Sequence, residues 1–354
     1  MNNHFALSKE HLLKHVGSMD QLASVQRIAF LDGRAKSVEA FQIDTGSGLG
    51  FTVLSDRAMD LAGVNYNGRS LCWRSPAGIV APTYYERQGN GWLRGFSGML
   101  ATCGLRNVGP PSSEGLETYG IHGEISYAPA TDVSLVRGWE GDRYRIQLSG
   151  LVRESYLFGP NLTLRRTWKT EFGANWIELE DRVTNEGFRP EIHLHLYHWN
   201  FGFPFLNEKS RLYLTTNQVE ARDEVAKTGA WRTFLPPTAG FKEEVFIHSY
   251  RGKAPEEGHA LVVSDDTERS FAVELSYTTR DLPYLWQWKM CGQGDYVLGV
   301  EPTNSLMGGR GRWQEWHQPS QLQPGETRQF RLRFTVLSNS EAVSGAMLRY
   351  AKGA

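Results

Sequence analysis

Residues 329–337 read QFRLRFTVL, a stretch in which apolar and polar side chains alternate. Phe330 and Phe334 fall on one face of an extended strand, whereas Arg331 and Arg333 fall on the other. This period of two predicts a β-strand with one face in a core and one face in solvent. A half-buried strand of this kind is typical of antiparallel sheets.

Similar runs recur along the chain on the N-terminal side of this stretch. Turn sequences such as GSG, EGD, FGAN and NEG separate them. The runs occupy residues 41–44, 48–56, 144–156, 162–171, 175–185, 259–265, 271–279 and 295–301. We therefore predict an all-β fold, a large antiparallel β-sandwich. The 11 Trp, 14 Tyr and 37 Gly suit wide sheet faces, many turns and an aromatic-lined groove.

The N-terminal segment differs because its pattern is helical. Ser8 can cap a first short helix, and a capping-box pattern begins at Ser18. We expect residues 1–35 to form a helical extension packed on the main domain, and residues 36–354 to form a single sandwich domain. Residues 75–129 are rich in Gly and Pro, which predicts long ordered loops around a groove.

Composition excludes several classes of protein. The 354 residues are 40% hydrophobic, enough for a large core. The 38 basic and 39 acidic residues show no basic block, so we expect neither nucleic acid nor a membrane as partner. The three cysteines form no CxxC pair, which favours a reducing compartment. No signal-peptide pattern is visible, and we expect a cytoplasmic monomer or homodimer.

Three of the ten histidines fall within residues 191–204, which read EIHLHLYHWNFGFP. Strand alternation places Glu191, His193 and His195 on one face and leaves His198 on the other, unless a bulge intervenes. An HxH pair with a further His or Glu can hold a divalent metal, but hydrogen-bonded histidines in a sheet would give the same pattern. His198 lies where the strand gives way to a loop, a common position for functional side chains.

Two further acid/base candidates lie elsewhere in the chain. His122 precedes Gly123, which allows a close backbone approach, in a loop-like region. Glu301 follows the apolar run VLGV and precedes Pro302, which we expect to stop hydrogen-bonded pairing at that point. A carboxylate at the mouth of a sheet can act as a general base.

These motifs occur in a recognisable order: HG at 122–123, NWIELEDRVTNEG leading into LYHWNFG, GVEP, and LQPGETRQFRLRFTV. Over roughly residues 40–337 this order resembles the galactose mutarotase (aldose 1-epimerase) superfamily. More narrowly, VLSDRAMDL, GRSLCWRSPAG, GMLATCGLRNVG, HGEIS and YHWNFGFP are similar to a divergent bacterial branch of aldose-epimerase-like proteins (DUF4432-like). The resemblance implies a galactose mutarotase-like sandwich and an isomerase that interconverts the anomers of a free sugar or sugar derivative.

The resemblance also implies roles for individual residues. His198 resembles the general acid that protonates the ring oxygen of a pyranose, and Glu301 resembles the base that takes the anomeric hydroxyl proton. His122 resembles a second histidine that positions the sugar. The chain departs from the family pattern where the usual HxYFN reads HWNFG and where the NR motif has no clear counterpart in TCGLRNVG.

Several other side chains suit the hydroxyls and C–H faces of a carbohydrate. The candidates are Arg57, Asp60, Arg106, Asn200, Asp223, Gln287, Trp288 and Lys289. Trp288 is equally consistent with a core position. Arg57 and Asp60 are equally consistent with a buried pair that braces the sandwich.

Hemiacetal opening needs an acid and a base that flank one carbon, and it requires no metal, nucleotide or redox cofactor. His and Glu suit this reaction near neutral pH. Two other interpretations stay open. One is a metal-dependent sugar epimerase or isomerase that uses His193 or His195 with Glu191, and the other is a non-catalytic carbohydrate-binding protein. In each case the expected partner is a small-molecule carbohydrate.

Overall fold

The computed structural model describes residues 7–306, 308, 310–311 and 320–350. Large antiparallel sheets with few short helices build the described chain, so the predicted all-β sandwich is confirmed. Its largest sheet contains eight strands, in the order β15 (Arg211–Leu214), β18 (Glu257–Val263), β19 (Ala272–Thr278), β23 (Thr327–Leu337), β12 (Trp176–Asn185), β11 (Asn161–Glu171), β10 (Arg143–Ser155) and β9 (Thr131–Glu140).

Two further large sheets complete the sandwich. The five-stranded sheet consists of β1 (Ser24–Ala29), β2 (Glu39–Asp44), β3 (Leu49–Leu54), β4 (Asp60–Tyr66) and β5 (Arg69–Ser70). The six-stranded sheet has the order β16 (Gln218–Ala221), β17 (Glu244–Ser249), β20 (Tyr284–Cys291), β21 (Tyr296–Thr303), β14 (Leu194–Gly202) and β6 (Leu100–Leu105).

The remaining elements are short. Two small antiparallel pairs are β7 (Ser112–Glu114) with β8 (Glu117–Tyr119), and β13 (Glu191–Ile192) with β22 (Gln321–Leu322). The α-helices are α1 (Lys9–Leu13), α2 (Glu224–Lys227) and α3 (Ser340–Met347). The 3₁₀ helices are η2 (Met19–Gln21), η3 (Gly33–Ala35), η4 (Pro82–Tyr84), η5 (Gly91–Gly95) and η6 (Ile125–Tyr127). None of the helices in the described residues is long and apolar enough to span a membrane.

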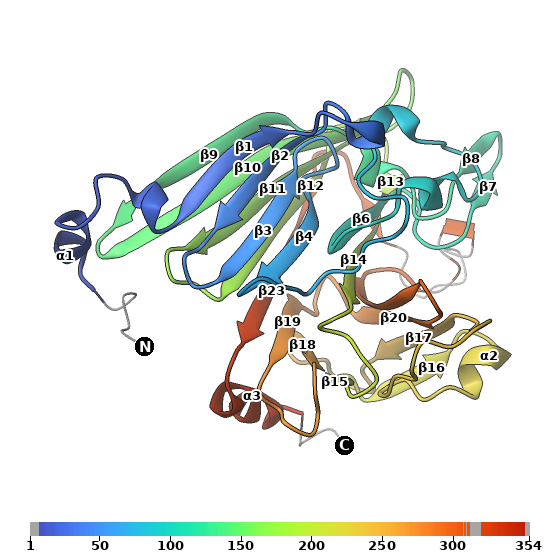
Figure 1. The fold of residues 1–354 in the computed structure, drawn as a ribbon. Helices are drawn as coiled ribbons and strands as arrows, with labels where there is room; N and C mark the ends of the chain where they lie inside the picture. The colour runs from blue at the N-terminus through green and yellow to red at the C-terminus, as the bar shows by residue number, and fades with distance from the viewer. Residues whose placement is uncertain (1–6, 307, 309, 312–319, 351–354) are drawn as a thin grey trace.

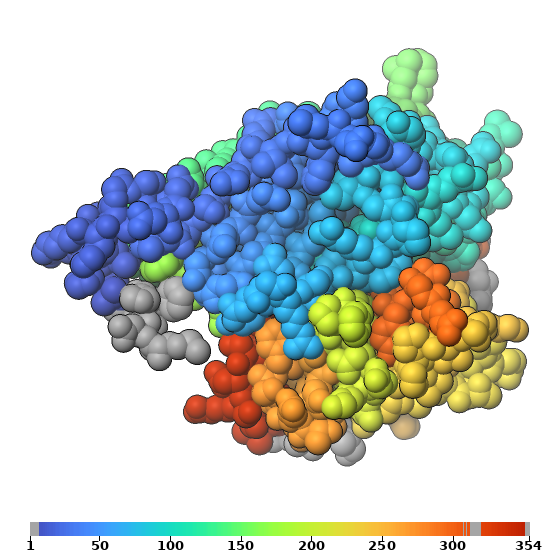
Figure 2. All heavy atoms as spheres, viewed as in Figure 1, coloured from blue at the N-terminus to red at the C-terminus, as the bar shows by residue number. Residues whose placement is uncertain are grey.

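One face of the eight-stranded sheet packs against the other two large sheets (Figure 1). The alternation read from residues 329–337 sets this packing: the ring of Phe334 on β23 stacks on Trp199 of β14 at 5.6 Å between centroids. In the space-filling view the N-terminal half (blue and cyan) covers the top of the molecule, and the C-terminal strands (yellow to red) form the bottom (Figure 2). The main core, to which Phe334 and Trp199 belong, lies between the sheets.

The far face of the six-stranded sheet carries a second apolar cluster. Leu194, Leu196 and Trp286 of the sheet pack there against Trp92 and Phe96, which come from the Gly- and Pro-rich region. The predicted loops over residues 75–129 are present, but the region also contributes β6 to the sheet. Both faces of β6 are buried, so its sequence lacks the alternation that reveals a half-exposed strand.

The N-terminal segment is only partly helical. Ser8 accepts a hydrogen bond from the His11 N–H and caps α1, and Ser18 caps η2, as predicted. The expected helical extension over residues 1–35, of which residues 1–6 lie outside the described residues, also contains β1, and this strand pairs along its whole length with β2. The boundary between an extension and a main domain at residue 35 stays a prediction.

Candidate active site

The six-stranded sheet brings His198 and Glu301 together. They lie on the neighbouring strands β14 and β21, and the pairs Leu196–Thr303 and Trp199–Val300 place them directly opposite each other. Their side chains share one face, with His198 Nε2 3.2 Å from Glu301 Oε1. The prediction that Pro302 ends pairing is wrong, because β21 continues to Thr303 and pairs with β20 throughout. Only on the β14 side does pairing skip this proline, which has no N–H to donate.

Asn200 fixes the orientation of the His198 ring. The Asn200 amide nitrogen donates to the backbone oxygens of Gly98 at 3.1 Å and His198 at 2.9 Å. Its side-chain oxygen therefore faces His198 Nδ1, at 2.6 Å. Because an amide oxygen only accepts, Nδ1 carries a hydrogen, and in the neutral ring Nε2 presents its lone pair toward Glu301.

Burial shapes the electrostatics of this pair. His198 and Glu301 are 4% and 2% exposed. Burial raises the pKa of Glu301 to about 8, with a smaller contribution from Glu243. Burial likewise lowers the pKa of His198 well below its ordinary value. Both shifts disfavour charge, and so favour a neutral imidazole and a protonated carboxyl.

Aromatic side chains surround the pair. The His198 ring lies 4.9 Å from Phe96, 5.6 Å from Trp288 and 5.7 Å from His122 between centroids. The His122 ring in turn lies 4.8 Å from Trp92, and burial lowers its pKa to about 4. His122 and Trp288 are the partly exposed members of this group, so they border the approach from solvent.

Gly299 leaves space beside the pair. A Cβ at this position would lie 2.4 Å from Glu301 Oε1 and 3.0 Å from His198 Cε1. Contacts that short would force the carboxyl or the imidazole to move. The site therefore requires a glycine at position 299.

The HxH histidines occupy the opposite face of β14. His193 and His195 are fully buried and pack against Phe330 of β23, at 5.7 and 5.0 Å between centroids. Glu191 lies apart from them on β13, 3.7 Å from Arg106 Nε. Across residues 7–306, 308, 310–311 and 320–350, no three His, Cys, Asp or Glu side chains gather closely enough to hold a metal ion.

Gln287 and Lys289, predicted to bind substrate, also lie away from the pair. Strand alternation along β20 puts Trp286 and Trp288 on the face of Glu301 and turns these two residues to the other face. There Gln287 bonds to the Trp231 backbone oxygen at 2.7 Å, and Lys289 bonds to Glu244 at 2.8 Å.

Arg57 and Asp60 both lie in buried hydrogen-bond networks, and their role as sugar contacts stays a prediction. Arg57 donates to the backbone oxygens of Ser126 at 2.6 Å and Val80 at 2.8 Å. Asp60 pairs at 2.6 Å with Arg166, not with Arg57. Both side chains are buried and already satisfied.

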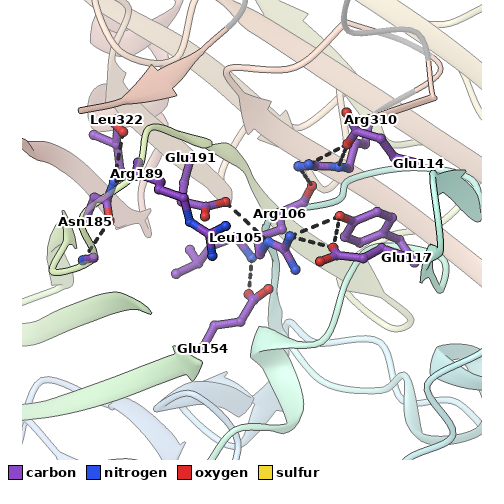
Figure 3. Close-up of polar contacts among 12 residues, drawn as sticks. Leu105, Arg106, Glu114, Glu117, Glu154, Asn185, Arg189, Glu191, Arg310 and Leu322 are labelled. Atoms are coloured by element: carbon purple, nitrogen blue, oxygen red, sulfur yellow. Dashed lines mark hydrogen bonds and ion pairs between the residues drawn. The ribbon is translucent and has the colours of Figure 1, made fainter. Parts of the chain in front are cut away.

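The two remaining candidates lie outside the immediate pair. The Asp223 carboxylate caps α2 and contacts Arg222, which bonds to Glu243 at 2.9 Å; Glu243 in turn accepts from Trp288 Nε1 at 2.9 Å. Arg106 projects into a separate cluster of charges beyond the end of β6 (Figure 3).

Sequence reasoning missed the residues that enclose the site. Trp92, Phe96 and Gly299 reach or border His198 and Glu301, yet none had been singled out. Gly299 could have been found from the sequence, because positions 299 and 301 of one strand face the same side of the sheet. Trp92 lies in the short 3₁₀ helix η5 and Phe96 caps it, and one turn is too short to show a period.

Comparison with known proteins places this geometry in context. Residues 35–336 match the family described as Domain of unknown function (DUF4432). The fold is similar to the crystal structure of a putative aldose 1-epimerase from Klebsiella pneumoniae, with a TM-score of 0.88 and 29% identity over 94% of this chain and 90% of that chain. No curated protein matches the chain.

More distant structures share the architecture. A galactose mutarotase-like protein from Clostridium acetobutylicum aligns with a TM-score of 0.59 and 12% identity, over 88% of this chain and 98% of that chain. Galactose 1-epimerase from Lactobacillus acidophilus aligns with a TM-score of 0.56 and 13% identity, over the same shares of the two chains. These likenesses show the fold, and the mutarotase-like sandwich predicted from the motif order is confirmed.

Proposed function

We propose that this chain, which belongs to the DUF4432 family, is an aldose 1-epimerase-like isomerase that interconverts the anomers of a free sugar or sugar derivative. One observation carries the proposal: His198 Nε2 and Glu301 Oε1 lie 3.2 Å apart, buried on one face of a sheet. The similarity to the Klebsiella protein supports the same class of reaction.

The reaction would need one of the two residues to be protonated and the other to be free to accept a proton. Ring opening transfers a proton to the ring oxygen as the bond from that oxygen to the anomeric carbon breaks. A second proton leaves the anomeric hydroxyl, whose oxygen becomes the carbonyl oxygen. The open sugar then rotates about its C1–C2 bond and closes on the other face with both transfers reversed. Glu301 and His198 supply the acid and the base that this exchange requires.

The protonation state sets the order of roles. In the empty site the proton would reside on Glu301, so Glu301 first acts as acid and His198 Nε2 as base. On reclosure the protonated His198 acts as acid and the Glu301 carboxylate as base. The assignment implied by the resemblance, His198 as acid, corresponds to the ion-pair form of the same two groups. Each residue therefore serves both roles within one turnover.

Two substitutions test the pair directly. Glu301→Gln keeps the shape of the side chain but cannot exchange the proton, and His198→Asn removes Nε2. Each should lower kcat by roughly 10²- to 10⁴-fold, with little change in sugar affinity. The measurement is anomer exchange by polarimetry or NMR, across aldoses, deoxy sugars and uronic acids.

A matched control comes from the same sheet. His248 is also buried, but it faces the other side of the sheet and bonds to Gln287 at 2.9 Å. His248→Asn should leave kcat unchanged. The proposal is wrong if no sugar in the panel equilibrates faster with the wild-type protein, or if Glu301→Gln retains the full rate.

A further inference from the structure

A pocket with a volume of about 280 Å³ lies beyond the end of β6. We call it the Arg106 pocket; the residues used below that line it are Tyr85, Arg106, Glu117, Tyr119, Glu154 and Tyr156. Its volume is close to the lower end of the range for small-molecule sites. Figure 3 shows Glu117 and Glu191 directed toward Arg106, and Glu154 directed toward the neighbouring Leu105 backbone.

Two buried charged groups in this pocket have bonding capacity left over. Glu154 Oε2 accepts from the Leu105 N–H at 2.7 Å, and Arg106 Nη2 donates to Glu117 at 2.7 Å. Within the part of the chain that the structure describes, Glu154 Oε1 and Arg106 Nη1 make no hydrogen bond. Both residues are only 7% exposed, so few water molecules can hydrogen-bond to these two atoms.

The balance of charge in the pocket disfavours an ionic ligand. Arg106 is paired with Glu117, and Arg87 is paired with Glu124 at 2.7 Å. An anion would meet the unpaired Glu154 carboxyl, and a cation would meet two guanidinium groups. A neutral hydroxyl, by contrast, can accept from Arg106 Nη1 while it donates to Glu154 Oε1.

The walls of the pocket add a second recognition element. Tyr85, Tyr119 and Tyr156 line it with aromatic surface, which suits the apolar C–H faces of a sugar ring. Burial also raises the pKa of Glu154 to about 7, so near neutral pH this carboxyl is able to donate as well as accept. Adjacent hydroxyls on one ring would match this mixture of donors and acceptors.

The Arg106 pocket is separate from the His198–Glu301 pair. Ala101 of β6 lies opposite His198, whereas Leu105 lies opposite Leu194. Four residues along a strand span about 13 Å, so the two places lie at different ends of β6. They are neighbours all the same, because Gly123, which follows His122, also lines the pocket. Occupation of this pocket therefore does not depend on the acid/base chemistry of the pair.

We propose that the Arg106 pocket binds a neutral polyol, in the form of one sugar unit, through Arg106 and Glu154. This site is additional to the proposed function and stands without it. A sugar unit held here would be a distinct ligand, or the far end of a carbohydrate longer than a monosaccharide.

Methyl glycosides provide the test, because their blocked anomeric centre cannot undergo ring opening. Isothermal titration or ligand-observed NMR would measure the affinity of a panel of neutral methyl glycosides and methylated disaccharides for the intact protein. Glu154→Gln keeps an acceptor for the Leu105 N–H but replaces the free Oε1. It should weaken binding roughly ten- to a hundredfold.

Further variants guard against loss of folding. Tyr156 is 43% exposed, so Tyr156→Ala should fold normally and still weaken binding by removing one wall. Glu178→Gln on β12 is the matched control and should leave the affinity unchanged. The proposal is overturned if no glycoside binds, or if Glu301→Gln weakens binding while Glu154→Gln does not. Binding that weakens with Glu154→Gln supports it even if the wild-type protein catalyses no anomer exchange.

Discussion

Asn200 contacts the catalytic candidate His198 directly. It is fully buried, and its amide already bonds to Gly98, to the His198 backbone and to His198 Nδ1. The sequence placed Asn200 among the sugar contacts, although positions 198 and 200 share a face of one strand and are natural partners. We therefore regard it as a positioning residue.

Opposite substitutions at Asn200 should move the pH profile in opposite directions. The hydrogen bond from His198 to Asn200 raises the pKa of His198, against the larger lowering caused by burial. Asn200→Leu should shift the His198 limb of the kcat profile to lower pH and reduce kcat by roughly ten- to a hundredfold. Asn200→Asp, which adds a negative charge, should shift that limb to higher pH. A purely structural role predicts equal losses of rate with no shift.

Glu301 should make the stability of the protein depend on pH. Its pKa is raised to about 8 in the folded state, so between roughly pH 4.5 and 8 the folded chain binds more protons than the unfolded chain. The free energy of unfolding should therefore fall as pH rises through this window, by at most about 1.4 kcal/mol per pH unit, and level off above it.

Glu301→Gln removes this titration and should flatten that part of the curve. Urea denaturation at a series of pH values measures the free energy of unfolding of both proteins. The difference between wild type and variant gives the contribution of Glu301 alone, without that of Glu154, whose pKa is also raised. Identical pH dependence in the two proteins would contradict the raised pKa.

At the scale of the element, regular strands and the loops over residues 75–129 could be read from the sequence, but the side chains that these loops bring to the site could not. β10, β11, β12 and β23 alternate clearly because one face of each is solvated. β6 was not predicted, because all six of its residues are buried and its sequence therefore does not alternate. Trp92 and Phe96 reach His198 from the single-turn helix η5, whose position depends on tertiary contacts.

Arg57 holds that segment in place. Its guanidinium donates to backbone oxygens of Val80 and Ser126 and lies 3.9 Å from the centroid of the Tyr127 ring. Arg57→Met should leave these carbonyls unsatisfied, at a cost of about 1.5–3 kcal/mol for each hydrogen bond to the charged group. Hydrogen exchange should then accelerate around residues 79–97 and 125–128 but not in β10–β12. A uniform acceleration across the chain would contradict a local role.

At the scale of the molecule, the sandwich was predictable but the partners of its strands were not. Alternation assigns each strand a buried face, yet it carries no information on which distant strand lies alongside. The pairing of β12 with β23 joins segments that are far apart in the chain. The register that opposes His198 to Glu301 is of the same long-range kind.

One buried network ties the three large sheets together. Arg166 on β11 bonds to Asp181 on β12 and to Asp60 on β4, and Asp60 accepts from Thr102 on β6. Tyr197 on β14 donates to Asp181 at 2.8 Å. Every large sheet thus contributes to a single cluster.

Removal of the arginine should destabilise the whole molecule. Arg166→Met leaves two buried carboxylates without their cation and should cost about 3–5 kcal/mol of unfolding free energy, measured by urea denaturation. Arg182→Met is the matched control, since Arg182 is exposed on the neighbouring strand. Adding Asp60→Asn and Asp181→Asn should restore part of the loss. Equal costs for the two arginine variants would show that the network contributes no stability.

The central position of β23 has a consequence for biosynthesis. β12 ends at Asn185, but the strand that covers its edge is complete only at Leu337, 152 residues later. At typical elongation rates of about 5–20 residues per second, the ribosome takes roughly 8–30 s to cover that interval. Throughout it, the nascent chain carries an open strand edge of the kind that recruits chaperones or promotes aggregation.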